Sequence, residues 1–89
     1  ITMTREILNL KEFYQTTDLS CATSLYYLGY KINSIDKTNP SKSIFLIEIK
    51  NGIDGDIKRF WNKELVIEPQ LYSACLREVK NRLYNTVEH

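Results

Sequence analysis

The sequence predicts an α+β fold, a small single domain in which helices pack on one face of a short antiparallel sheet with a central hairpin. Two apolar stripes at helical spacing, near residues 18–28 and 69–84, predict the helices. Between them, two β-type segments joined by an Asn-Pro turn predict the hairpin. With 89 residues, 43% of them apolar and 26% charged, the chain has the size and composition of one globular domain. We expect residues 1–89 to form this single domain, with a folded part over about residues 7–85.

The first helix is expected over residues 18–28. Thr17 or Asp18 can accept hydrogen bonds from the unpaired amides of its first turn. Gly29 suits a left-handed cap at its C-terminal end. The apolar positions between these signals form one stripe at helical spacing, namely Leu19, Ala22, Leu25, Tyr26 and Leu28. Residues 7–15 fit either a strand or a short helix, and we favour an extended segment.

The hairpin is predicted from residues 30–35 and 43–50, with turn-forming residues at 38–42 between them. An antiparallel arrangement is the simplest connection for so short a turn. The second strand is apolar on both faces, with Phe45, Ile47 and Ile49 on one side and Ile44 and Leu46 on the other. We therefore expect this strand to be central in the sheet and at least partly covered on both sides.

Three further elements are expected after the hairpin. Asp54 or Asp56 can cap a short helix whose apolar side carries Ile57, Phe60 and Trp61. Residues 65–68 have the composition of a brief strand. Pro69 then begins a long helix that runs to about Tyr84, with apolar residues at helical spacing, namely Tyr72, Leu76, Val79 and Leu83.

Several of these positions together resemble an uncharacterised family, a domain of unknown function found in small proteins of phages, plasmids and bacterial genomes. The resemblance covers about residues 13–84 and rests on Thr17-Asp18-Leu19, Ala22, Leu25, Gly29, Phe45, Phe60, Val66, Pro69, Leu76-Arg77, Lys80, Leu83 and Tyr84. These positions are caps, a glycine and core residues. The resemblance therefore implies a fold and supplies no catalytic residues.

The same resemblance implies a mobile element as the context, in which small proteins commonly bind nucleic acid or bind and inhibit a host protein. A weaker resemblance exists to winged-helix DNA-binding accessory proteins of conjugative plasmids, which also combine short helices with a hairpin. Here the hairpin precedes the second and third helices instead of following them. This difference in order argues against assigning a standard recognition helix.

The sequence offers little for catalysis or for a metal site. The one histidine is His89, and we interpret residues 87–89 as the start of an expression tag. Histidine-dependent nucleophilic catalysis and histidine-ligated zinc then lack an essential group. Asp54 and Asp56 supply too few oxygen ligands for Mg²⁺ or Ca²⁺, and the scattered glycines form no phosphate-binding loop. We expect no enzyme activity, no catalytic residue, no metal, no cofactor and no small-molecule substrate.

The expected location is the cytoplasm, with no membrane partner. No apolar run approaches the roughly 20 residues that a bilayer requires, and the N-terminus lacks a signal-peptide pattern. Cys21 and Cys75 lie far apart in predicted helices, without a CxxC motif or a companion histidine. This arrangement favours reduced, buried thiols over a disulfide.

Nucleic-acid binding, to DNA or RNA, is the function we expect, because phosphate contacts require only Lys or Arg gathered on one face. The net charge of +1 is too small to drive binding by overall charge, so local groups must supply it. Two basic helices packed side by side would join their faces, although ordinary solvated helix faces have a similar composition. The candidate residues are Lys37 and Lys42 in the hairpin, Lys58, Arg59 and Lys63 in the short helix, and Arg77 and Lys80 in the last helix.

The alternative is a protein-interaction module, either a homodimer subunit or a binder of a host protein. Successive residues on a helix point about 100° apart, so Tyr26 and Tyr27 cannot both be fully buried on one stripe. Exposed aromatic rings offer a large contact area to a protein partner. The candidate interface residues are Tyr27 and Trp61. Self-association would also add buried area to so short a chain.

Overall fold

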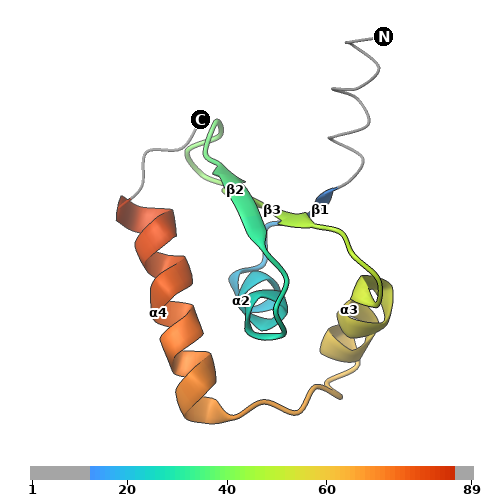
Figure 1. Cartoon of the computed structure of the whole chain (residues 1–89). Coiled ribbons are helices and arrows are strands. Elements are labelled where there is room, and N and C mark those ends of the chain that lie inside the picture. Colours follow the sequence, from blue (N-terminus) through green and yellow to red (C-terminus); the bar gives the residue numbers. More distant parts are fainter. Residues whose placement is uncertain (1–12, 86–89) are drawn as a thin grey trace, which may run out of the picture.

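A computed structural model describes residues 13–85 of the chain. In this range three strands form one antiparallel sheet in the order β1-β3-β2, accompanied by three helices (Figure 1). The elements are β1 (Phe13–Thr16), α2 (Leu19–Tyr27), β2 (Ile32–Asp36), β3 (Ile44–Glu48), α3 (Ile53–Trp61) and α4 (Pro69–Asn85). The predicted α+β class is confirmed. The predictions for residues 7–12 and 87–89 lie outside the described residues.

A β-bulge in β2 sets the buried face of the sheet. Ile32 lies opposite Ile47 and Ile35 lies opposite Phe45, with Asn33 as the extra residue at the register shift. Side chains alternate along a regular strand, so residues three apart would point to opposite faces. The bulge brings both β2 isoleucines to one face. All four apolar side chains are at most 2% exposed, and this face forms one wall of the core.

β3 is the central strand, as its two apolar faces predict. It pairs with β1 on one side and with β2 on the other. On the face opposite the core, Ile44 and Leu46 are half-buried. Ile49 lies beyond the end of the strand and is 48% exposed, so its predicted place on the buried face is wrong. In the described part of the ambiguous first segment, residues 13–15, the strand over Phe13–Thr16 confirms the extended interpretation.

α2 lies at the centre of the domain, between α3 and α4 and below the sheet as drawn in Figure 1. The Asp18 carboxylate caps it by accepting a hydrogen bond from the Cys21 amide at 2.8 Å. Gly29, with φ of 105°, follows its end in the left-handed conformation that the sequence predicts. Cys21, Ala22 and Leu25 are fully buried. α2 therefore fills the middle of the core between the sheet and the two outer helices.

α3 begins at a glycine and not at the predicted aspartate cap. Its N-cap is Gly52, which has φ of 95° and makes no side-chain cap. Asp54 and Asp56 are therefore not caps. They lie in the first turn, where a carboxylate is still favoured by the positive end of the helix. The Asp56 carboxylate instead accepts a hydrogen bond from the buried Tyr30 hydroxyl at 2.5 Å.

Residues 65–68 do not form the predicted strand. The segment links α3 to α4 and pairs with no strand among the described residues. Its side chains still alternate as in a strand, with Leu65 and Ile67 half-buried and Val66 92% exposed. A strand needs a neighbour for its backbone, and the sheet lies on the other side of α2 (Figure 1).

α4 covers Pro69–Asn85, in agreement with the spacing of its apolar residues. Val79 is 1% exposed and anchors the helix in the core. The other predicted core positions are half-buried on the same side, namely Tyr72, Leu76 and Leu83. Among the described helices, none has the length and apolar character needed to cross a membrane.

Polar contacts fix the rotation of α4 about its axis. The Tyr26 hydroxyl of α2 donates a hydrogen bond to the Glu78 carboxylate. The Arg82 guanidinium donates to the carbonyl oxygens of Ile32 at 2.8 Å and Asn33 at 3.5 Å, beside the β-bulge. These contacts join α4 to both α2 and β2, and they determine which side of the helix faces solvent.

Candidate nucleic-acid interface

The side of α4 that faces away from the core carries polar and cationic residues at helical spacing. We call these residues the outer face of α4, and they are Gln70, Ser73, Arg77, Lys80, Asn81 and Tyr84. All are exposed, and the exposed fraction of Tyr84 is 71%. At about 1.5 Å per residue the face extends over about 21 Å along the helix.

Positive charge on this face is not balanced by acidic neighbours on the same helix. The acidic residue of α4, Glu78, is turned toward α2, where it accepts the hydrogen bond from Tyr26. This bond raises the pKa of the Tyr26 hydroxyl. Arg77 and Lys80 lie on adjacent turns, and neither forms an ion pair within residues 13–85. The outer face of α4 therefore presents two cations to solvent.

The cations near α3 are accompanied by an equal number of carboxylates. Residues 54–64 contain Lys58, Arg59 and Lys63 together with Asp54, Asp56 and Glu64. Arg59 forms an ion pair with Asp56. α2 separates α3 from α4 (Figure 1), so the two helices do not pack side by side and their basic faces do not join.

The hairpin turn is held by its own side chains. The Asp36 carboxylate accepts a hydrogen bond from the Thr38 amide at 2.9 Å, and hydrogen bonding to Thr38 lowers the pKa of this carboxyl group. The Asn39 side chain accepts hydrogen bonds from the amide and hydroxyl of Ser41. The Lys42 amide closes the turn on the Asn39 carbonyl at 3.0 Å. The turn is therefore a defined projection at one end of the sheet.

The two hairpin lysines have different surroundings. Lys37 is half-buried and directly follows β2, the strand that Arg82 of α4 contacts. Lys42 is exposed and lines a cavity of about 390 Å³ with residues 15–17 and Ile44, next to β1. The structure therefore places Lys37 just after the strand next to α4 and Lys42 toward the opposite edge of the sheet.

The two aromatic residues predicted for a protein interface also differ. Tyr27 is half-buried, with its ring 6.4 Å from that of Tyr72, and its hydroxyl accepts a hydrogen bond from the Glu68 amide at 3.0 Å. Tyr27 thereby holds the start of α4. Trp61 is 56% exposed and lies edge-on to Phe60, with ring centroids 4.8 Å apart. Of the two, Trp61 is the more accessible to a partner.

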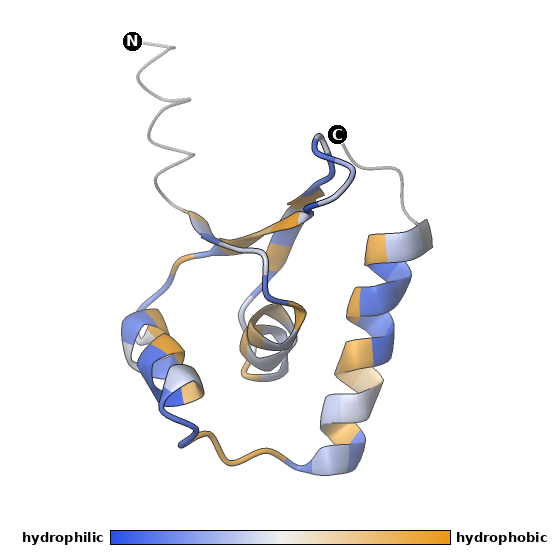
Figure 2. Ribbon diagram, turned by 180° about the vertical axis from the view of Figure 1, so that it is seen from behind, coloured by the Kyte–Doolittle hydropathy of each residue, from blue (hydrophilic) through white to orange (hydrophobic). Residues whose placement is uncertain are grey.

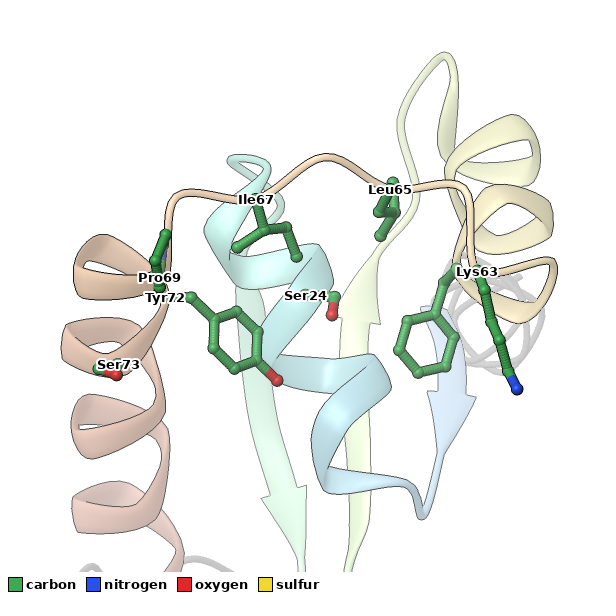
Figure 3. Close-up of a pocket in the computed structure, with 8 residues that line it drawn as sticks. Ser24, Lys63, Leu65, Ile67, Pro69, Tyr72 and Ser73 are labelled. Carbon is green, nitrogen blue, oxygen red and sulfur yellow. The ribbon is translucent and has the colours of Figure 1, made fainter.

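An apolar groove of about 530 Å³ lies between α2 and the segment that links α3 to α4 (Figure 3). Leu65 and Ile67 point into it from the linking segment, and the Tyr72 ring enters it from α4. The Ser24 hydroxyl lies on α2 at the base of the groove. Sequence reasoning missed this groove because its walls come from segments far apart in the chain.

Neither a metal site nor a reactive thiol is evident in residues 13–85. No group of three or more His, Cys, Asp or Glu residues in this range could hold a metal ion. The two cysteines are free thiols, Cys21 in the core and Cys75 half-buried on α4. Burial raises the pKa of the Cys21 thiol, which keeps it protonated and weakly nucleophilic at neutral pH.

These features define a small α+β domain with a cationic outer helix and an apolar groove. Residues 11–85 match the family model described as Domain of unknown function (DUF5659), and the chain belongs to this family. The match confirms the expected membership in a domain-of-unknown-function family over nearly the predicted residues. No curated protein and no solved structure is significantly similar to the chain.

Proposed function

We propose that this chain is a small, non-catalytic nucleic-acid-binding accessory protein that uses the outer face of α4. One observation supports this most directly. Arg77 and Lys80 lie on adjacent turns of an exposed helix face without a carboxylate, because the exposed Glu78 lies beside this face and is hydrogen-bonded to Tyr26 of α2. Phosphate binding requires cations held on a common exposed face. The same proposal includes a phage or plasmid as the origin of the protein, and this part of it rests on the family resemblance.

The remaining side chains of the outer face suit contact with bases. An α-helix fits the major groove of duplex DNA, which is about 12 Å wide, and amide side chains such as Gln70 and Asn81 can pair with the edge of adenine. The exposed Tyr84 ring can stack on an unpaired base. In this proposal Arg77 and Lys80 supply the phosphate contacts on which these groups depend.

The other cations have secondary roles in the proposal. Lys37 and Lys42 add phosphate contacts at the hairpin end of the molecule. Lys58, Arg59 and Lys63 contribute less, because the carboxylates of residues 54–64 reduce the local positive potential.

Fluorescence anisotropy with labelled 20-base-pair duplex DNA, single-stranded DNA and single-stranded RNA tests the proposal. Each neutralised phosphate contributes a slope of about −0.9 to the logarithm of affinity against the logarithm of salt concentration for duplex DNA. The double variant Arg77→Ala with Lys80→Ala should therefore reduce the magnitude of this slope by about 1.8 and weaken binding at low salt.

The matched control is the double variant Lys58→Ala with Lys63→Ala, which removes the same charge from the far side of α2. It should retain most of the affinity and slope. The proposal fails if none of the three probes binds at low salt, or if the α4 pair and the α3 pair have equal effects. Differences among the three probes identify the preferred nucleic acid.

Exposed apolar side chains favour a second candidate, a protein-interaction module. Trp61, Val66 and Leu71 are 56%, 92% and 60% exposed. They belong to one stretch of chain around the link between α3 and α4, and much of that link is hydrophobic in Figure 2. Large apolar side chains gathered on one exposed stretch mark protein contact sites.

A further inference from the structure

We propose that residues 64–68 are an open strand edge that binds an extended peptide segment of another protein. The segment would carry Lys or Arg at its first and fifth positions and apolar residues at its second and fourth. Apart from Ser73, which also lines the groove, this binding site is separate from the outer face of α4, so the inference goes beyond the proposed nucleic-acid binding.

The backbone of this stretch is extended and unpaired. Within residues 13–85, the amides and carbonyls of Leu65, Val66 and Ile67 form no hydrogen bond. The amides on either side are fixed, since Glu64 donates to the Arg59 carbonyl at 2.8 Å and Glu68 donates to the Tyr27 hydroxyl at 3.0 Å. Valine and isoleucine favour strands. Backbone groups alternate between the two edges of an extended segment, so a peptide that adds a strand here would pair the free groups of Leu65 and Ile67.

The side chains of the stretch divide between two faces. Leu65 and Ile67 are half-buried and point into the apolar groove (Figure 3). Glu64, Val66 and Glu68 are exposed on the other face. Residues directly opposite one another in paired strands point to the same face. The two residues of a partner strand that lie opposite Leu65 and Ile67 would therefore enter the groove.

The groove can receive two such side chains. Its volume of about 530 Å³ is in the range of small-ligand pockets. Phe60, Pro69 and the Tyr72 ring line it, so its walls favour apolar groups. This fixes the second and fourth positions of the partner segment as apolar.

The charges of Glu64 and Glu68 favour a different protein as the partner over a second copy of this chain. Symmetric antiparallel pairing of two copies about Val66 would set each Glu64 opposite Glu68 of the other copy. Like charges directly opposite are unfavourable. Symmetric registers centred on Leu65 or Ile67 would set a glutamate opposite Val66 instead. Lys or Arg at the first and fifth positions of a partner would form ion pairs with both glutamates.

Binding of a labelled, end-capped peptide, Lys-Val-Thr-Val-Lys, to the full chain tests the inference by fluorescence anisotropy. We expect saturable binding that is lost with Glu-Val-Thr-Val-Glu. It should also be lost with Lys-Val-Thr-Pro-Lys, because the partner residues opposite Leu65 and Ile67 donate their amides to the open edge and proline has no amide to donate. The second comparison keeps the charges of the peptide and removes its ability to form a strand.

A charge exchange locates the site. Glu64→Lys should weaken binding of Lys-Val-Thr-Val-Lys about threefold, the effect of one exposed ion pair. A peptide with one terminal Lys replaced by Glu, at the end that faces residue 64, should regain the lost affinity. The control is Asp54→Lys, which makes the same charge change at an exposed position on α3 and should have no effect.

Three results would overturn the inference. They are no binding at millimolar peptide, equal binding of the proline peptide, and a dimer of the unchanged chain by light scattering that the peptide dissociates. The double variant Arg77→Ala with Lys80→Ala should bind the peptide normally. Loss of nucleic-acid binding and loss of peptide binding are thereby measured separately.

Discussion

Replacing Arg82 with methionine should loosen the attachment of α4 to the sheet. The guanidinium donates to the Ile32 carbonyl at 2.8 Å and to the Asn33 carbonyl at 3.5 Å, where the β-bulge interrupts the regular register. Methionine is similar to arginine in length and helix propensity. The substitution therefore removes charge-assisted hydrogen bonds while it spares the helix itself.

The geometry sets the size of the effect. A hydrogen bond from a charged donor contributes roughly 1.5–3 kcal/mol, while a contact at 3.5 Å adds little. Arg82 is half-buried, so water can replace part of the lost interaction. We therefore expect the free energy of unfolding to fall by about 1.5–2 kcal/mol. For a domain of this size this corresponds to a fall in Tm of about 10 °C.

Urea denaturation followed by circular dichroism measures the effect, with equal m-values required for the comparison. Lys80→Met is the matched control, because Lys80 is exposed on the same helix and forms no ion pair among the described residues. Its free energy of unfolding should change by less than about 0.5 kcal/mol. If the two variants lose equal stability, Arg82 does not attach α4 to β2 and the reasoning is refuted.

Three further substitutions test other parts of the domain. Thr23→Val should raise the free energy of unfolding by about 1 kcal/mol, because the buried Thr23 hydroxyl has no hydrogen-bond partner among the described residues; lower stability in urea would contradict this. Burial and the bond to Asp56 raise the pKa of Tyr30 from 10.0 to about 12. The Tyr30 hydroxyl therefore stabilises the fold fully below pH 10, and this stabilisation is lost as the pH rises through 12. Tyr30→Phe should reduce the fall in the free energy of unfolding that is measured across this pH range. Gly29→Ala places a side chain at φ of 105° and should cost about 1 kcal/mol, so an unchanged Tm would exclude strain there.

Local signals in the sequence predicted most of the elements. Asp18, Gly29 and Pro69 mark helix ends through their own backbone and side-chain chemistry, and each marks the boundary expected of it. The central position of β3 followed from its two apolar faces. These features depend on residues close together in the chain, which is why spacing and capping rules were sufficient.

Features that depend on distant segments were not predictable in this way. Residues 65–68 have the composition of a strand, but a strand also needs a neighbour, and α2 lies between this segment and the sheet. α3 begins at Gly52, which has a positive φ, whereas the sequence predicted a cap from one of the nearby aspartates. The separation of the basic helices by α2, and the groove formed by Ser24, Phe60 and Tyr72, are products of packing.

The order of strands in the sheet has a consequence for how the domain assembles and opens. β2 and β3 meet across a short turn, from Asp36 to Ile44, whereas β1 first meets β3 from Thr16 to Phe45, a chain separation between three and four times longer. The longer closure costs roughly 1.1 kcal/mol more in chain entropy, and non-local pairing is slow. We therefore expect β1 to join the sheet last and to detach first. Under agitation or proteolysis near Phe13, the edge of β3 would then become available for pairing between molecules.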